Sequence, residues 1–433
     1  MPRSDVAGRV GGPGAGTGSG SRAAGIALLV LGAVLMGVVA VTTPWNVLGP
    51  GAPEVRPDPA RDFTPAQLAR ADAFDAATSL PGYLSLALTL VIAGVLVLTP
   101  VGARLIGRIR GPWWVRAILG VLGVYVVSLL LRWPLGMWME TVLREYGLST
   151  QTWGTWTADR LKNFGLQVVL SGVAVLVIVA LARKWPRTWW IPASLGAFTL
   201  TVVLSFAYPV VVEPMFNTFT PLPAGQLRAD LLAMAAKDGV PVKDVLVADA
   251  SRRTTALNAY VSGFGATRRI VVYDTLVSQP ADEVKLIVAH ELGHAKRDDV
   301  LYGTLVGALG AAAGTCLLFI AVQALRRRAG VSSAGDPRAV GLLVGLISLG
   351  TVLSGPAQNV VSRQIEARAD AHALDLTRDP ATFVAMQKSL AVRNISDLSP
   401  NAVEYLLYAS HPSTAERIAM ARSWAGLNGL PRP

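Results

Sequence analysis

Cysteine is nearly absent from this 433-residue chain, which contains only Cys316. A single cysteine excludes internal disulfides and a zinc site built from thiolates. Because Cys316 lies inside an apolar stretch, it is interpreted as a small core or lipid-facing side chain. Histidine is also rare, with four residues in the whole chain. A pair of histidines at metal-ligand spacing is therefore improbable by chance.

Charged residues are scarce as well. They make up 15% of the chain, whereas hydrophobic residues make up 52% and the mean hydropathy is +0.46. These values are typical of a polytopic membrane protein and argue against two or three soluble domains. The net charge of +11 would suit a nucleic-acid-binding protein, but the basic residues form short clusters beside apolar runs. That is the pattern of membrane topology, so the expected partner is the lipid bilayer and not a nucleic acid.

Seven apolar stretches are long enough to cross the hydrocarbon core as helices. The first, 24–41, resembles a signal peptide but is followed by no clear small-x-small cleavage site, so it is interpreted as a retained anchor. The others are predicted at about 82–100, 115–136, 165–182, 190–211, 301–325 and 339–358. The last of these runs on without a breaker into the segment that carries Glu366 and Asp370.

Polar residues return between the fifth and sixth spans and indicate a soluble insert. In it, 226–237 is predicted to be a helix, and 245–248, 256–262 and 269–273 are predicted to form a small antiparallel sheet. An exposed edge of this sheet could bind an extended peptide as an added strand, or the sheet could be purely structural. The predicted organisation is a disordered tail (1–22), five spans with loops including a short helix near 65–77 (23–211), the insert (212–300), spans six and seven (301–360) and a helical C-terminal part (361–433).

The strongest chemical signal is His290-Glu-Leu-Gly-His294. On a helix the two histidines lie one turn apart on the same side. Two neutral imidazoles at this spacing supply half of a tetrahedral Zn²⁺ shell. Glu291 lies between them, where it can act as a general base on a water activated by the metal. The alternative is a helix that carries two histidines by chance.

Glu366 and Asp370 are also four residues apart and share one helix face. The first carboxylate would complete the metal shell, and the second would accept a hydrogen bond from a ligand histidine and fix its tautomer. The alternative is a solvated acidic face. His372 lies about 120° around the helix from Glu366, so it is interpreted as structural. His411 precedes a helix and is either a donor to a developing oxyanion or a plain surface histidine.

Several further stretches occur in a fixed order along the chain. They are 144–149 with 159–162, 213–217, 258–261 with 270–276, Ser362-Arg363-x-x-Glu366-x-x-Ala369-Asp370, and His411-Pro412 followed by Glu416-Arg417-Ile418. With the zinc motif and seven spans, this combination resembles the type I CAAX prenyl protease family of integral-membrane zinc metallopeptidases (peptidase family M48). It is more distantly similar to the bacterial heat-shock membrane metalloprotease.

The resemblance implies a polytopic α-helical membrane protein, with about seven transmembrane helices enclosing a chamber and a zincin-like α+β soluble insert. It also implies one Zn²⁺ ion per chain and three groups of functional residues. These are the zinc ligands His290, His294 and Glu366, the catalytic residues Glu291 (general base) and His411, and the surrounding residues Asp370 (orienting a ligand histidine), Asn258 and Arg417 (contacting the substrate).

The predicted activity is hydrolysis of protein or peptide substrates by a zinc endopeptidase of a cell membrane. The composition, rich in Ala, Arg and Gly, is typical of a bacterium with a GC-rich genome. Membrane-protein processing or quality control is therefore favoured over the alternative, CAAX-type prenyl-protein processing. A catalytically silent membrane scaffold or lipid-binding protein is an alternative of another class. The intact Glu291 argues against it, because a scaffold could keep the fold without its base. Transport is a weaker alternative, because the spans contain few charges.

The orientation in the membrane is predicted differently by the two lines of reasoning. Basic clusters at 104–116, 183–187 and 326–338, with the N-terminal arginines, fall on one side of the membrane. By the positive-inside rule that side is cytoplasmic and the zinc site faces outward. The resemblance instead implies a cytoplasmic catalytic face. The charge pattern belongs to this chain, and it favours the outward orientation.

Overall fold

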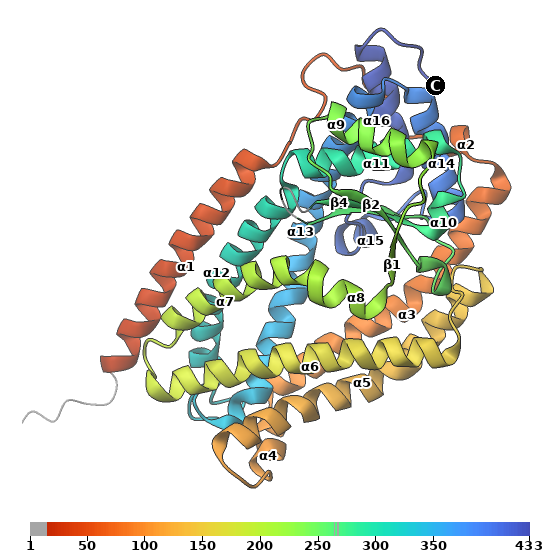
Figure 1. Ribbon diagram of the computed structural model, residues 1–433. Coiled ribbons are helices and arrows are strands. Elements are labelled where there is room, and N and C mark those ends of the chain that lie inside the picture. Colours follow the sequence, from red (N-terminus) through yellow and green to blue (C-terminus); the bar gives the residue numbers. More distant parts are fainter. Residues whose placement is uncertain (1–14, 264, 266–267) are drawn as a thin grey trace, which may run out of the picture.

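The computed structural model describes residues 15–263, 265 and 268–433 (Figure 1). Within these residues seven helices are long and apolar enough to cross a membrane, which confirms the number of predicted spans. They are α1 (Ala15–Thr42), α3 (Pro65–Leu98), α5 (Trp113–Glu145), α6 (Trp153–Lys184), α7 (Trp190–Ala207), α12 (Asp299–Leu325) and α13 (Val340–Thr377). Shorter helical elements connect them: α2 (Pro59–Asp62), α4 (Val101–Gly107), η1 (Tyr208–Val212), α8 (Glu213–Phe216) and η4 (Pro337–Ala339).

Helix α1 begins earlier than predicted. Residues 1–14 of the predicted disordered tail lie outside the described residues, but 15–22 are already helical, so the prediction is wrong for that part. No proline interrupts the segment from Ala15 to Thr42, and a helix propagates from an apolar span into neighbouring residues at little cost. Gly20 also allows close packing, because a Cβ there would lie 2.9 Å from the carbonyl oxygen of Arg187.

The short helix predicted near 65–77 and the second span form one continuous helix, α3. It begins at a capping box in which Thr64 and Gln67 exchange hydrogen bonds between side chains and backbone. Pro81 lies inside α3 without ending it. Proline within a membrane helix is tolerated where neighbouring groups satisfy the freed carbonyls. The prediction of a break before the span was therefore wrong.

The soluble part contains a four-stranded sheet with the order β1-β2-β4-β3. The strands are β1 (Phe219–Pro221), β2 (Asp244–Ala248), β3 (Ala259–Ser262) and β4 (Arg269–Tyr273). β2 and β4 pair in parallel, whereas β1 and β3 pair antiparallel with the central strands. The predicted sheet was purely antiparallel, which is wrong, because the hairpin of β3 and β4 returns the chain beside β2 in the same direction. β3 is left as an edge strand.

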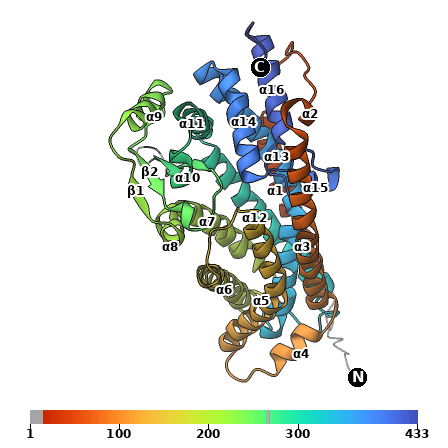
Figure 2. The same ribbon diagram turned by 90° about the vertical axis from the view of Figure 1, so that its right-hand side faces the viewer.

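Helices from two distant parts of the chain surround one hydrophobic core next to this sheet. They are α9 (Gln226–Lys237), α10 (Asp274–Val277), α11 (Ala281–Lys296), α14 (Pro380–Asn394) and α16 (Thr414–Leu427). Two further short helices of the soluble part are η2 (Ala250–Arg252) and α15 (Ala402–Leu407). The core joins Leu231, Ile270 and Leu292 of the insert with Phe383 and Trp424 of the C-terminal part. The insert and the C-terminal part therefore form one unit, which Figure 2 shows with α11 between α9 and α14.

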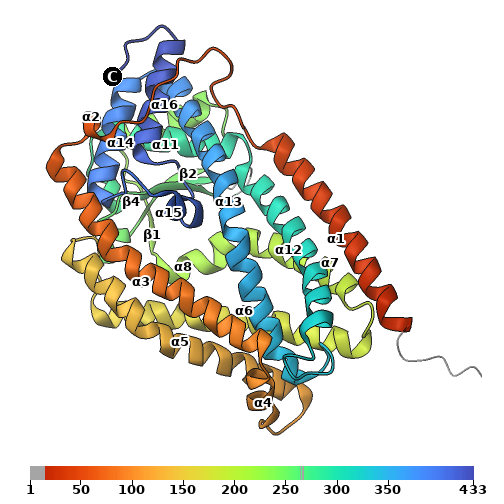
Figure 3. The same ribbon diagram turned by 180° about the vertical axis from the view of Figure 1, so that it is seen from behind.

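A second core holds the membrane helices together, with Val121, Val179, Trp189, Phe319 and Leu343 among its buried residues. This core lies toward the end of the molecule that carries α4, opposite the sheet (Figure 1). Helix α13 links the two ends, because it begins beside α4 and continues until it packs against α11 and α16 (Figure 3). The prediction that the seventh span runs on to Glu366 and Asp370 is confirmed.

Candidate metal centre

Helix α11 presents His290 and His294 at its C-terminal half. Asp282 and Glu283 stabilise its first turn, where the helix dipole favours negative charge. The apolar side of α11 is buried in the core of the soluble unit. Gly293 allows α13 to approach closely, because a Cβ at this position would lie 3.1 Å from the Cβ of His372. Packing on both sides thus fixes the helix that carries the two imidazoles.

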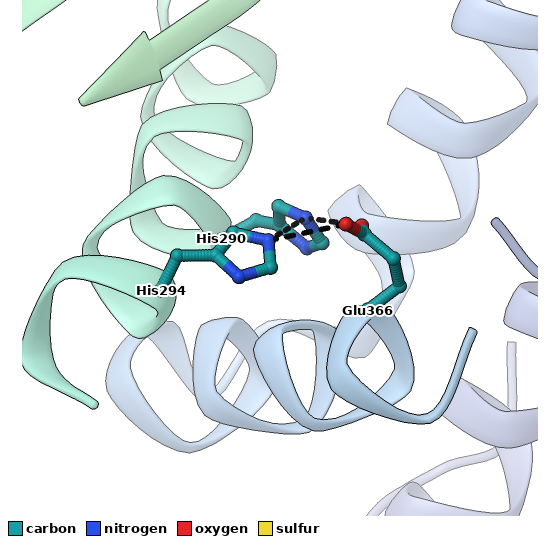
Figure 4. A group of neighbouring side chains, drawn as sticks. All are labelled: His290, His294 and Glu366. Carbon is teal, nitrogen blue, oxygen red and sulfur yellow. Dashed lines mark hydrogen bonds and ion pairs between the residues drawn. The ribbon is translucent and has the colours of Figure 1, made fainter. Parts of the chain in front are cut away.

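The two histidines and Glu366 converge on one point (Figure 4). His290 Nε2 lies 3.2 Å from His294 Nε2 and 3.1 Å from Glu366 Oε2, and His294 Nε2 lies 3.5 Å from Glu366 Oε1. Bonds of about 2.0–2.1 Å in a tetrahedral zinc shell place ligand atoms about 3.3 Å apart. Two imidazole nitrogens and one carboxylate are also the donor set of open zinc sites. The three residues therefore fit a zinc ion.

Each imidazole is held through its other nitrogen by a carboxylate. His290 Nδ1 lies 2.8 Å from Asp370 Oδ1, and His294 Nδ1 lies 2.9 Å from Asp299 Oδ2. The Nδ1–H group of each imidazole donates to its carboxylate, so the lone pair of Nε2 faces the point between the three ligand residues. Asp370, expected from the sequence to orient a histidine, is fully buried and accepts a 2.7 Å hydrogen bond from Arg417 Nε.

Asp299 and its partner Arg368, which donates to Asp299 Oδ1, were missed in the sequence. They repeat the arrangement of Asp370 and Arg417 on the other histidine. Asp299 is five residues beyond His294, which is not a helix-face spacing. It reaches His294 because α11 ends at Lys296 and Asp298 adopts a left-handed conformation with φ 53°. The only signal in the sequence was an acidic residue at the start of a span.

The electrostatics of the site favour a cation. Burial lowers the pKa of His294, but the hydrogen bonds to Asp299 and Glu366 outweigh it and raise the pKa to about 10. An environment that stabilises a positive imidazole to this extent carries excess negative charge. A divalent cation held by neutral imidazoles would compensate the same charge. The electrostatics and the donor geometry therefore agree.

Two cavities meet at the metal centre. One, of about 950 Å³, extends from α11 toward α3 and the α15–α16 segment, and one of about 440 Å³ follows β3 and the turn between α11 and α12. Asn258, Glu291 and His411 line both cavities. The edge strand β3 contributes Ala259, Tyr260 and Val261 to the smaller one. Because they share Asn258, Glu291 and His411, the two cavities adjoin at the metal centre, and together they are called the trough below.

The remaining predicted residues lie at or near this trough. His411 Nε2 is 3.3 Å from Glu366 Oε2, and its side chain is 57% exposed. Arg417 lines the larger cavity while it binds Asp370. His372 lies away from the metal ligands and bonds Asp238 at 2.9 Å, as expected for a structural residue.

Two protein-family models match this chain. Residues 60–218 match the family model described as CAAX prenyl protease N-terminal, five membrane helices, and residues 221–425 match peptidase family M48. An uncharacterized metalloprotease, YhfN, of Bacillus subtilis is 30% identical over 84% of this chain and 87% of its own. A CAAX prenyl protease 1 homolog of Oryza sativa is 31% identical over 69% of this chain and 71% of its own.

The CAAX prenyl protease 1 of Saccharomyces cerevisiae is 28% identical over 67% of this chain and 69% of its own. The crystal structure of S. mikatae Ste24p is 22% identical and superposes with a TM-score of 0.71 over 92% of this chain and 98% of that one, so it has the same fold. The chain therefore belongs to peptidase family M48 and is an integral-membrane metalloendopeptidase.

Proposed function

We propose that this chain is a zinc endopeptidase in which His290, His294 and Glu366 bind one Zn²⁺ ion. The observation that carries the proposal is the convergence of two imidazole Nε2 atoms and one carboxylate at the spacing of a tetrahedral shell. His290 lines the larger cavity of the trough, and His294 and Glu366 line the smaller one, so the point between the three residues is open to the trough. Asp370 and Asp299 orient the two histidines from outside the shell.

Bound zinc would supply a water of lowered pKa and polarise the scissile carbonyl. Glu291 takes the proton of the attacking water and passes it to the leaving amine nitrogen. Burial raises the pKa of Glu291 against the opposing effect of the two imidazoles, which moves the carboxylate toward the range of an efficient base at neutral pH. His411 donates a hydrogen bond to the developing oxyanion. Asn258 and the β3 edge hold the substrate backbone in an extended form.

The test is zinc content and cleavage of an unstructured reporter peptide, measured on purified wild type and three variants. Glu291→Gln should keep about one zinc per chain and lose hydrolysis, whereas Glu366→Ala should lose both. Glu283→Gln removes a carboxylate from the same helix two turns earlier and should behave as wild type. Cleavage by Glu291→Gln at the wild-type rate would refute the role of Glu291. A folded wild type that binds no zinc would refute the metal site.

We further propose that the physiological role is processing or quality control of membrane proteins. In the proposed mechanism the trough binds the backbone of the substrate, and the membrane spans keep the trough close to the bilayer. A second candidate is CAAX-type processing, which is favoured by relatives named CAAX prenyl protease 1 at 28–32% identity. Matched reporter peptides with and without a farnesylated cysteine separate the two. Similar cleavage of both supports general processing, and cleavage of only the farnesylated peptide supports the second candidate.

The orientation that we propose places the metal centre outside the cytoplasm. The basic clusters around α4, at the end of α6 and after α12 gather at the end of the molecule opposite the sheet (Figure 1). Cys316 is fully buried, so a single introduced cysteine reports its own side. A membrane-impermeant maleimide should label Lys237→Cys on intact cells and Arg108→Cys only after permeabilisation. The opposite result would place the catalytic face in the cytoplasm.

A further inference from the structure

Helix α13 carries more of the site than its metal ligand. Asn359, Arg363, Glu366 and Asp370 are spaced by four, three and four residues, so they form one stripe along the helix. The C-terminal half of the stripe serves the metal centre. The N-terminal half, Asn359 and Arg363, contacts a different part of the chain. Arg363 belongs to the motif noted in the sequence but has no role in the chemistry described above.

The half-buried Arg363 binds the backbone that leads to His411. Its Nη1 donates to the carbonyl oxygens of Tyr405 at 2.9 Å and Ala409 at 2.6 Å. Its guanidinium also stacks on the Tyr405 ring, 4.2 Å from the centroid. Asn359 Nδ2 donates to the carbonyl oxygens of Leu406 and Leu407, at 3.2 and 2.9 Å. The carbonyls of Tyr405, Leu406 and Leu407 lie in the last turn of helix α15, where no further helical N–H groups exist to bond them, and that of Ala409 follows the helix.

The same segment is anchored again on its C-terminal side. The Tyr405 hydroxyl donates to Glu416 Oε2 at 2.6 Å. Glu416 forms the capping box of α16 with Ser413. His411 lies between the two anchors, and its ring contacts only Ser410 and Glu366 among the described polar groups. Its position at the metal centre therefore depends on the backbone around it more than on contacts of its own ring.

We propose that Arg363 is a positioning residue for His411, with Asn359 supporting the same turn. Arg363 binds two carbonyls of the segment that leads to His411. It thereby sets the distance between the His411 imidazole and Glu366, which lies on the same helix as Arg363. The planar guanidinium suits this task, because it donates in fixed directions to two acceptors and stacks on an aromatic ring. The proposal rests on the role of His411 in the proposed function.

The test is a double-mutant cycle of Arg363→Ala and His411→Ala, with kcat, KM and zinc content measured for each protein. Arg363→Ala should lower kcat by roughly 10- to 100-fold, the effect of displacing a catalytic group by about 1 Å, and should keep about one zinc. In the His411→Ala background the same substitution should change kcat by less than about twofold, because the two residues act through one another. An equal loss in both backgrounds, or no loss in wild type, would overturn the proposal.

Two further variants protect the test against misfolding. Asn359→Ala loosens the same turn more mildly and should show the same dependence on His411. Arg363→Lys keeps the charge without the fork and should fall between wild type and Arg363→Ala. The exposed Arg393→Ala serves as the matched control for loss of an arginine and should leave kcat unchanged. A wild-type rate in His411→Ala would overturn the positioning role while the protease activity stands.

A readout that needs no hydrolysis separates this proposal from the proposed function. Diethyl pyrocarbonate modifies exposed histidines, and mass spectrometry resolves His411 from His372, which Asp238 holds on α13. Arg363→Ala should change the modification rate of His411 relative to His372, because the imidazole loses its contact with Glu366. An unchanged ratio would overturn the positioning role even if the wild type proves inactive, a result that would itself refute the proposed function.

Discussion

Asp299→Asn should weaken zinc binding although Asp299 is not a metal ligand. The carboxylate lies 2.9 Å from His294 Nδ1 and is only 10% exposed. It makes the imidazole a stronger donor to the metal and fixes its tautomer. Asparagine has the same size and can still accept the Nδ1 proton, but it lacks the negative charge. The substitution also removes the ion pair between Asp299 and Arg368.

The expected size of the effect follows from these contacts. Loss of a carboxylate partner of a metal-bound histidine typically lowers metal affinity by roughly 10- to 100-fold. That corresponds to about 1.4–2.7 kcal/mol at 25 °C. Asp299→Asn should fall near the lower value, because one hydrogen bond survives. Asp299→Ala should approach the upper value, because the hydrogen bond and the charge are both lost.

The assay is a zinc titration against a competing chromogenic chelator, followed through both chelator absorbance and peptide cleavage. Asp298→Asn is the matched control, because Asp298 is the neighbouring residue and pairs with Arg268 instead of a histidine. Asparagine tolerates the left-handed conformation at this position, so the turn should persist. Wild-type zinc affinity in both Asp299→Asn and Asp299→Ala would refute the reasoning.

Two other predictions concern the helix that carries the histidines and the metal itself. Gly293→Ala places a Cβ 3.1 Å from His372 and should lower the free energy of unfolding by about 1–3 kcal/mol, measured as a lower Tm in detergent. Gly303→Ala, whose Cβ meets nothing within 4 Å, is the control and should be neutral or stabilising. Equal effects of the two substitutions would contradict the packing argument. A strong chelator should abolish cleavage and leave helical circular dichroism intact, because the core around Leu231 and Phe383 needs no metal. One equivalent of zinc should then restore activity, and loss of helicity on chelation would contradict this expectation.

The sequence predicts an element of the fold where the spacing of residues or the length of an apolar stretch is enough to define it. The spans follow from apolar length, and the helix of His290 and His294 follows from charges at its ends and spacing along it. The direction of the sheet was not predictable in this way. Strands β2 and β4 are parallel because of where the hairpin with β3 lands, and that depends on long-range pairing. The short helix near 65–77 was predicted as separate from the second span because the segment before Pro81 is polar, but the helix continues through Pro81 into the apolar span.

For the candidate site too, residue spacing in the sequence predicts some contacts and tertiary packing decides the others. The sequence by itself determined the pairs that share a helix face, His290 with His294 and Glu366 with Asp370, because residues four apart on a helix always meet on one side. Only the tertiary structure decided that α11 and α13 face each other and that Asp299 returns to His294. It also decided that Arg363 holds the approach to His411. These contacts join residues through a left-handed turn or across a packed interface. Neither kind of contact produces a regular residue spacing that the sequence would show.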